Sequence, residues 1–242
     1  MRMKWIVATT VLLSGAGCML PPETGPRADG RGPKIAPMSA AQLGQTDFNR
    51  TVTIAMRDNL DSLLLLADKL YQRNPAQWRA AGARDAADAV KRVEQSILAR
   101  VPPPGLANLQ DIHILSVSLN PDYRGDRVAA FIYGLADTLI AAHNGRTVFY
   151  ANDLLDGQRV FNAARNVEAA AWMLASRHDV HGQPLLLANS WSDDGINLSF
   201  ERLFGAVIGR LDLVANLLGE NTRRLGINYA QGLMFFNFLP VR

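Results

Sequence analysis

Hydrophobic positions recur every three or four residues over five long stretches of the chain. These stretches cover residues 48–73, 85–100, 126–143, 156–177 and 199–218. In the first, the charged side chains fall largely off the hydrophobic stripe, as in an amphipathic helix. The last has the most regular stripe, formed by Phe200, Phe204, Val207, Leu211, Val214 and Leu218. The pattern therefore predicts five long helices that share an apolar core.

Local signals mark where these helices begin and end. Residues 39–42, Ser-Ala-Ala-Gln, match a capping box that can open the first helix. Asn74-Pro75 then starts a short helical piece, with Asn as the cap and Pro in the first turn. The run Pro102-Pro103-Pro104-Gly105 stops the second long helix, and Asn144-Gly145 ends the third.

Three other segments have weaker patterns. Residues 109–119 fit either a strand with alternating apolar positions or a short buried helix. Residues 178–196 predict an irregular excursion, within which 184–190 fits a strand or a helix. Polar Asn and Gln residues interrupt the apolar segment 225–241, which favours a core helix over a membrane span.

The elements together indicate an all-α protein. No alternation of strands with helices and no repeat of fixed period occurs in the sequence. The 242 residues are 48% hydrophobic and 19% charged, which suffices for one sizeable core. We therefore expect residues 39–242 to form a single bundle of about six to eight helices.

The N-terminus has the layout of a secretory signal peptide, residues 1–17. A basic start, Met1–Lys4, precedes the apolar run Trp5–Leu13 and the small residues Ser14–Gly17. The apolar run is too short for a membrane-spanning helix, which needs about 20 apolar residues. Cys18 follows directly and is the only cysteine of the chain.

The ending Gly15-Ala16-Gly17-Cys18 resembles the lipobox of bacterial lipoproteins, with Gly15 where that family prefers Leu. The resemblance implies that the signal is removed and that Cys18 carries acyl chains such as palmitate, which anchor the protein stably. In Gram-negative lipoproteins, Asp after the cysteine favours retention in the inner membrane. Met19 stands there instead, which favours the outer membrane with the folded part in the periplasm.

Residues 18–38 are expected to form a flexible tether behind this anchor. They are rich in Pro and Gly, a composition that does not pack into a core. In the polyproline form, about 20 residues at ~3 Å each span roughly 60 Å. The helical domain would therefore be held near the membrane without being pressed against it.

Three motifs in the body resemble a family of Gram-negative lipoproteins that has no established activity. These motifs are Tyr123–Val128, Asn162–Glu168 and Asn197–Phe204, and the resemblance would extend over most of residues 45–240. It implies an all-α lipoprotein, and it supplies no catalytic residues.

Few residues suggest chemistry. No Gly-x-Ser-x-Gly motif and no Gly-rich phosphate loop is present, and a single cysteine excludes an internal disulfide. His178 and His181, with Asp193 and Asp194, could form a metal site. They are weak candidates, because their spacing matches no established metal-binding motif. No catalytic residue, metal site or cofactor is therefore assigned.

Charged residues beside the apolar helix faces form the other candidate site. They suggest either an ion-pair network that fixes helix packing, which we favour, or a polar cleft. Glu168 is expected to be partly buried near Phe161 and Trp172. The candidate residues are Arg127, Arg165, Glu168, Glu201 and Arg202. Asp126, within an Arg-Gly-Asp tripeptide, is interpreted as a helix cap.

These patterns favour a non-enzymatic, periplasm-facing lipoprotein that binds or supports another envelope component. The membrane, through the lipid, and an envelope protein are the expected partners. Without Arg2 and Lys4 of the signal, the chain has 23 basic and 22 acidic residues, which gives no reason to expect nucleic acid. The alternatives are an envelope enzyme of hydrolase type, using residues such as Glu168 and His178, and a carrier of a hydrophobic ligand.

Overall fold

The computed structural model describes residues 40–192 and 195–236. Within them lie a 3-10 turn, seven α-helices and one short antiparallel hairpin. The elements are η1 (Ala40–Gly44), α1 (Asp47–Arg73), α2 (Pro75–Ala80), α3 (Ala86–Ala99), α4 (Ile112–Ser118), α5 (Arg127–Ala142), α6 (Gly157–Ser176), β1 (Ser190–Ser192), β2 (Gly195–Asn197) and α7 (Ser199–Phe236). The prediction of an all-α bundle is confirmed. The expected signal peptide and tether, residues 1–38, lie outside the described residues.

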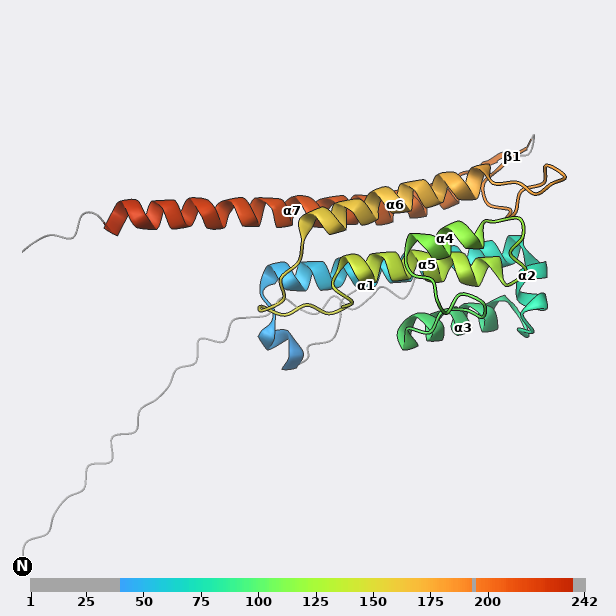
Figure 1. The fold of residues 1–242 in the computed structure, drawn as a ribbon, viewed down its shortest axis with the longest axis horizontal. Helices are drawn as coiled ribbons and strands as arrows, with labels where there is room; N and C mark the ends of the chain where they lie inside the picture. Colours follow the sequence, from blue (N-terminus) through green and yellow to red (C-terminus); the bar gives the residue numbers. More distant parts are fainter. Residues whose placement is uncertain (1–39, 193–194, 237–242) are drawn as a thin grey trace, which may run out of the picture. The chain divides into compact units, whose positions relative to one another are not determined.

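Helix α5 occupies the centre of the bundle. Its sequence is apolar around almost its whole circumference, and 13 of its 16 residues are buried. Helices α1, α3, α4 and α6 all pack against it. Figure 1 shows the resulting layers, with α6 and α7 side by side along one side of α1 and α5, and α3 on the other. The core is thus arranged around α5.

Short polar side chains start four of the helices. Thr46, Asp85, Asp126 and Asp156 each accept a backbone N–H from the first turn of the following helix. The capping of α5 by Asp126 is confirmed. Ser39 of the predicted capping box lies outside the described residues. The 3-10 turn η1 follows it, and α1 begins separately after its own Thr46 cap.

Residues 112–118 form a short helix, α4, which settles the ambiguity at 109–119. Ile114 and Leu115 are buried against α5, where Gly134 lets the two helices approach closely. A Cβ atom at position 134 would lie 3.0 Å from both of these side chains. The close approach explains why so short a helix is stable, since it buries its apolar residues against α5.

The segment between α6 and α7 is irregular, as predicted, only as far as residue 189, and within it an isolated bridge joins His178 and Pro184. The β1–β2 hairpin, which the sequence pattern does not predict, follows it. The side chain of Asn74 fixes this segment from the end of α1. Its Nδ2 donates to the Leu187 carbonyl at 2.9 Å, and its Oδ1 accepts the Leu187 N–H at 2.7 Å. Leu186 and Ala188, on either side, are buried.

Helix α7 is longer than its hydrophobic stripe predicts. It continues without a break from Ser199 to Phe236, so residues 225–236 extend the same helix instead of forming a separate one. Figure 1 shows this end of α7 extending beyond the helices that it packs against. No proline lies between Ser199 and Phe236, so every residue of α7 keeps a backbone N–H for the helix. Among the described residues, no helix is long and apolar enough to cross a membrane.

The buried His143 at the end of α5 predicts a loss of stability in acid. Its ring is 2% exposed, lies 5.5 Å from the Phe149 ring, and donates from Nδ1 to the Leu139 carbonyl at 2.8 Å. Burial lowers the pKa of His143, while the hydrogen bond to Leu139 acts in the opposite direction. The unfolded chain therefore binds the proton more readily than the folded protein, so the free energy of unfolding falls as the pH drops below about 6.5.

Chemical denaturation of wild type and His143→Gln between pH 7.5 and 5 measures this effect. His143→Gln should lose less stability over that range than the wild type. The matched control, His113→Gln at an exposed position, should keep the wild-type pH dependence. Parallel pH curves for wild type and His143→Gln would contradict the assignment.

Candidate functional site

A pocket of about 620 Å³ opens between α3 and the N-terminal end of α5. This volume lies within the range of ~300–1,000 Å³ that is usual for small-molecule sites. The residues that line it are Tyr71, Ala80, Ala81, Ala89, Arg92, Val93, Gln95, Ser96, Ala99, Val101, Pro102, Pro103, Pro104, Tyr123, Arg124, Gly125, Asp126 and Ala129. They come from four separate parts of the chain, so only the folded bundle assembles the pocket.

The walls of the pocket are largely apolar. Val93 and Ala89 on α3 face the three prolines of residues 102–104, which follow α3 directly. The chain turns sharply at the end of α3, where Arg100 adopts a left-handed conformation with φ of 56°. The hydroxyl of Ser96 donates to the Val101 carbonyl and fixes the proline segment next to the helix. The helix-stopping prolines therefore also form one wall.

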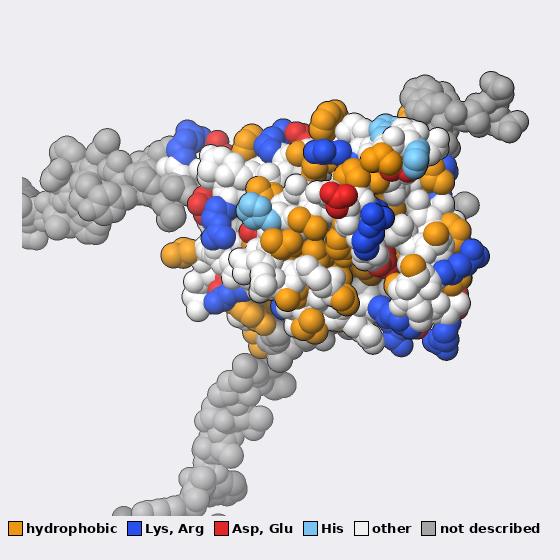
Figure 2. Space-filling model, turned by 45° about the vertical axis from the view of Figure 1, so that its right-hand side comes forward, with side chains coloured by type: hydrophobic (Ala, Val, Ile, Leu, Met, Phe, Trp, Pro, Cys, Tyr) orange, Lys and Arg blue, Asp and Glu red, His pale blue; other side chains and the backbone are white. Residues whose placement is uncertain are grey.

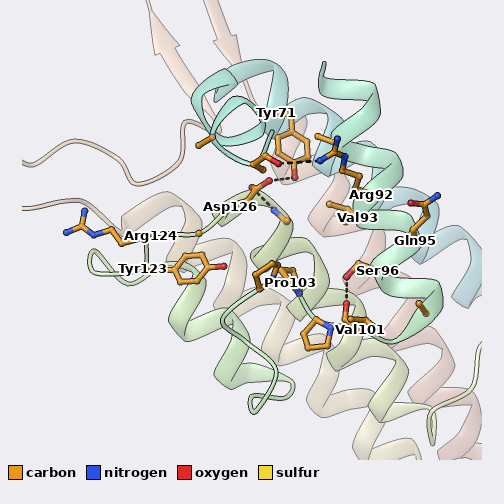
Figure 3. A pocket seen from close by; sticks show the side chains of 18 residues that line it. Tyr71, Arg92, Val93, Gln95, Ser96, Val101, Pro103, Tyr123, Arg124 and Asp126 are labelled. Carbon is orange, nitrogen blue, oxygen red and sulfur yellow. Dashed lines mark hydrogen bonds between the residues drawn. The ribbon is translucent and has the colours of Figure 1, made fainter. Parts of the chain in front are cut away.

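Tyr71 and Asp126 form a polar end of this pocket (Figure 3). The Tyr71 hydroxyl donates to Oδ2 of Asp126 at 2.7 Å, and the Ala129 N–H donates to Oδ1 at 3.0 Å. Tyr71 itself is 1% exposed. Burial raises the pKa of the Asp126 carboxyl, while these hydrogen bonds act in the opposite direction. Burial and the neighbouring Asp126 raise the pKa of Tyr71. An incompletely compensated carboxyl group thus lies at one end of an apolar pocket.

Arg92 and Tyr123 complete the polar part of the lining. Arg92 pairs with Asp88 at 2.8 Å and donates to the Ala81 and Gly82 carbonyls at 3.3 and 3.0 Å. Its guanidinium is therefore already engaged.

Tyr123 packs directly over Gly125, where a Cβ atom would collide with the phenol oxygen. The glycine of the Arg-Gly-Asp turn therefore allows this phenol to occupy its place in the pocket wall. Burial raises the pKa of Tyr123, and the nearby Asp126 adds to that shift.

Arg127 holds backbone carbonyls and no carboxylate. Its guanidinium donates to the carbonyls of Ser118, Asn120 and Pro121 at 2.9, 2.6 and 3.1 Å, and the residue is 8% exposed. Burial lowers the pKa of Arg127, and the positive charge of Arg124 adds to that shift. Arg127 thus fixes the loop between α4 and α5, and so positions the start of α5.

Arg165 and Glu168 form an ion pair at the surface of the bundle. Their closest nitrogen and oxygen atoms are 3.0 Å apart, and Arg165 also pairs with Asp212 on α7 at 2.8 Å. The side chains of Arg165 and Glu168 are 41% and 45% exposed, so Glu168 is an exposed residue and the expectation that it is partly buried is wrong. Exposed pairs typically contribute only ~0–1 kcal/mol to stability.

The remaining candidates lie apart from these. Glu201 is exposed and accepts a hydrogen bond from the Asn189 side chain at 2.8 Å, and Arg202 is exposed as well. The structure therefore does not join Arg127, Arg165, Glu168, Glu201 and Arg202 into one network, and none except Arg127 lies beside the pocket. Helix faces were visible in the sequence, but which faces meet depends on packing.

His178 and His181 are exposed loop residues. Nδ1 of His178 lies 2.7 Å from the Ser176 carbonyl. Asp179 accepts the His181 and Gln183 N–H groups at 2.8 and 2.9 Å, and so organises the turn between the two histidines. Within the described part of the chain, no group of three or more His, Cys, Asp or Glu could hold a metal ion. Asp193 and Asp194 lie outside the described residues.

The sequence alone did not identify the pocket. The pattern around Asp126 indicates only a helix cap, and nothing in the sequence of the first long helix distinguishes Tyr71. Tyr71 and Asp126 are 55 positions apart, so no local pattern links them. Comparison with protein-family models, with curated proteins and with solved structures finds no match to this chain.

The carbonyl-binding role of Arg127 predicts a large loss of stability on truncation. Arg127→Ala leaves three carbonyls without their donor. The carbonyl of Ser118 is buried, and a buried unsatisfied group costs ~1–3 kcal/mol, whereas Asn120 and Pro121 are exposed and their carbonyls can turn to water. We expect the free energy of unfolding to fall by about 2 kcal/mol in chemical denaturation. Arg127→Lys should recover only part of this stability, because one ammonium group cannot reproduce the planar array of N–H donors of a guanidinium group. Arg124→Ala, next to it but exposed, is the control, and an equal effect of the two alanine variants would contradict this role.

Proposed function

We propose that this chain is a lipid-anchored binding protein of the bacterial outer membrane. Its helical domain faces the periplasm, and its pocket binds a small, largely apolar ligand without converting it. The sequence of the N-terminus, ending at Cys18, supports the anchor. The pocket supports the binding role.

The observation that carries the binding role is the pocket between α3 and α5. It has the size of a ligand site, apolar walls and a few polar groups gathered at one end, which is the usual composition of such sites. Its lining holds no Cys, His or Lys and no Ser next to a base, and Asp126 is engaged as a helix cap. Binding therefore fits the lining better than hydrolysis.

The distribution of charge on one face of the molecule also favours a small-molecule ligand over nucleic acid. On the face drawn in Figure 2, hydrophobic side chains gather near the centre, and basic and acidic side chains are interspersed around them. A nucleic-acid-binding face would instead concentrate Lys and Arg. A neutral or amphiphilic small molecule is therefore the more suitable partner.

The anchor predicts a specific chemical modification. Cells that express the wild-type chain and are grown with an alkyne fatty acid should label it at Cys18. Cys18→Ser removes the thiol and should abolish both the label and sedimentation with the outer membrane. Equal labelling of wild type and Cys18→Ser would overturn the lipoprotein assignment.

The pocket predicts binding of a small apolar probe that a bulky side chain can block. The full chain in lipid nanodiscs should bind 2-phenylethanol, measured by ligand-detected NMR above the background of empty nanodiscs. Ala99→Phe places a ring in the pocket wall and should abolish this binding. Ala87→Phe, also an exposed alanine of α3 but outside the pocket, should bind as the wild type does. Equal binding by the two variants would overturn the pocket as the ligand site.

A further inference from the structure

We propose that the pocket selects ligands that carry a protonated amine on a small apolar body, with Asp126 and Tyr123 receiving the amine. This inference rests on the ligand-binding function proposed above, and it names the chemical class of the ligand.

The first argument is the charge of Asp126. Among the residues that the structure describes, no Lys or Arg forms an ion pair with it. Its hydrogen-bond donors are neutral: the Tyr71 hydroxyl and the backbone N–H groups of Ala129 and Val128. The raised pKa of the Asp126 carboxyl agrees with a charge that burial leaves incompletely compensated. A cation brought by a ligand would supply the missing compensation.

The neighbouring guanidinium groups do not fill this role. Arg92 is engaged by Asp88 and two carbonyls, and Arg127 by three carbonyls. Arg124 extends away from the pocket in Figure 3. The negative charge at the polar end therefore stays available to a ligand.

The second argument is hydrogen-bonding capacity. An ionised carboxylate has about four acceptor positions, and Asp126 uses three of them, for the Tyr71 hydroxyl and the backbone N–H groups of Ala129 and Val128. The Tyr123 hydroxyl, in the same stretch of the lining, has no hydrogen-bond partner among the described residues. An ammonium group has three donors and no acceptor, which matches free acceptor positions on a carboxylate and a phenol oxygen.

The same groups discriminate against other head groups. A carboxylate or phosphate on the ligand would meet the like charge of Asp126 in a pocket of low polarity. A hydroxyl could bond to Asp126 but would leave its charge uncompensated. Charge-assisted hydrogen bonds exceed neutral ones by about 1.4 kcal/mol, so the amine should bind about tenfold more tightly than the alcohol.

Three probes with one apolar body test this selectivity: 2-phenylethylamine, 2-phenylethanol and phenylacetate. Their dissociation constants are measured by equilibrium dialysis at pH 7 against the full chain in lipid nanodiscs, with empty nanodiscs as background. The amine should bind about tenfold more tightly than the alcohol, and phenylacetate most weakly.

Asp126→Asn tests whether the carboxylate causes the preference. Asparagine caps a helix about as well as aspartate, so the start of α5 should be preserved. The variant should lose the preference for the amine, so that amine and alcohol bind about equally. Asp156→Asn makes the same change at the cap of α6, outside the pocket, and should keep the full preference. Tyr123→Phe, which leaves both the charge and the cap of Asp126 in place, should weaken binding of the amine.

The outcomes separate this inference from the proposed function. Equal binding of amine and alcohol by the wild type, or an amine preference that survives in Asp126→Asn, would overturn the inference while the pocket remains a ligand site. Failure of all three probes to bind the wild type would overturn the proposed function, and the inference with it.

Discussion

The enclosure of α5 is the constraint on which the rest of this structure depends. A helix that is apolar on all sides is stable only where other elements cover it, and four helices do so here. Gly134 lets α4 approach closely, and Arg127 fixes the loop that leads into α5 by holding three carbonyls. Coverage is less complete at the N-terminal end, where α3 and the prolines after it leave a pocket beside Asp126 and Ala129. The candidate site thus lies where the packing around the central helix ends.

Helix starts and stops could be predicted from the sequence because their causes are local. Asp85, Asp126 and Asp156 each cap the helix that directly follows, and the prolines at 102–104 act on the helix just before them. Residues 112–118 could not be decided, because a short apolar run fits a strand or a helix until its partner is known. That partner is α5, which comes later in the chain.

The candidate site was not predictable for the same physical reason. A helical wheel shows which charged residues lie beside an apolar face, but which faces meet is decided by packing. Arg165 therefore pairs with Asp212 of a different helix, whereas Arg127 bonds to backbone carbonyls that no residue pattern reveals. The hydrogen bond from Tyr71 to Asp126 likewise arises only when α1 and α5 pack together.

The side chain of Asp126 caps α5 and also places a negative charge in the pocket. Capping stabilises the folded protein, whereas burial of the charge destabilises it. As a cap it satisfies a backbone N–H and places negative charge near the positive end of the helix dipole, which stabilises α5. Its burial nevertheless raises the pKa of the carboxyl, so the folded protein binds that proton more readily than the unfolded chain. The free energy of unfolding therefore falls as the pH rises and the Asp126 carboxyl ionises. Asparagine would cap α5 without this cost, so under the proposed function the carboxylate at position 126 serves the charge of the ligand as well as the cap of the helix.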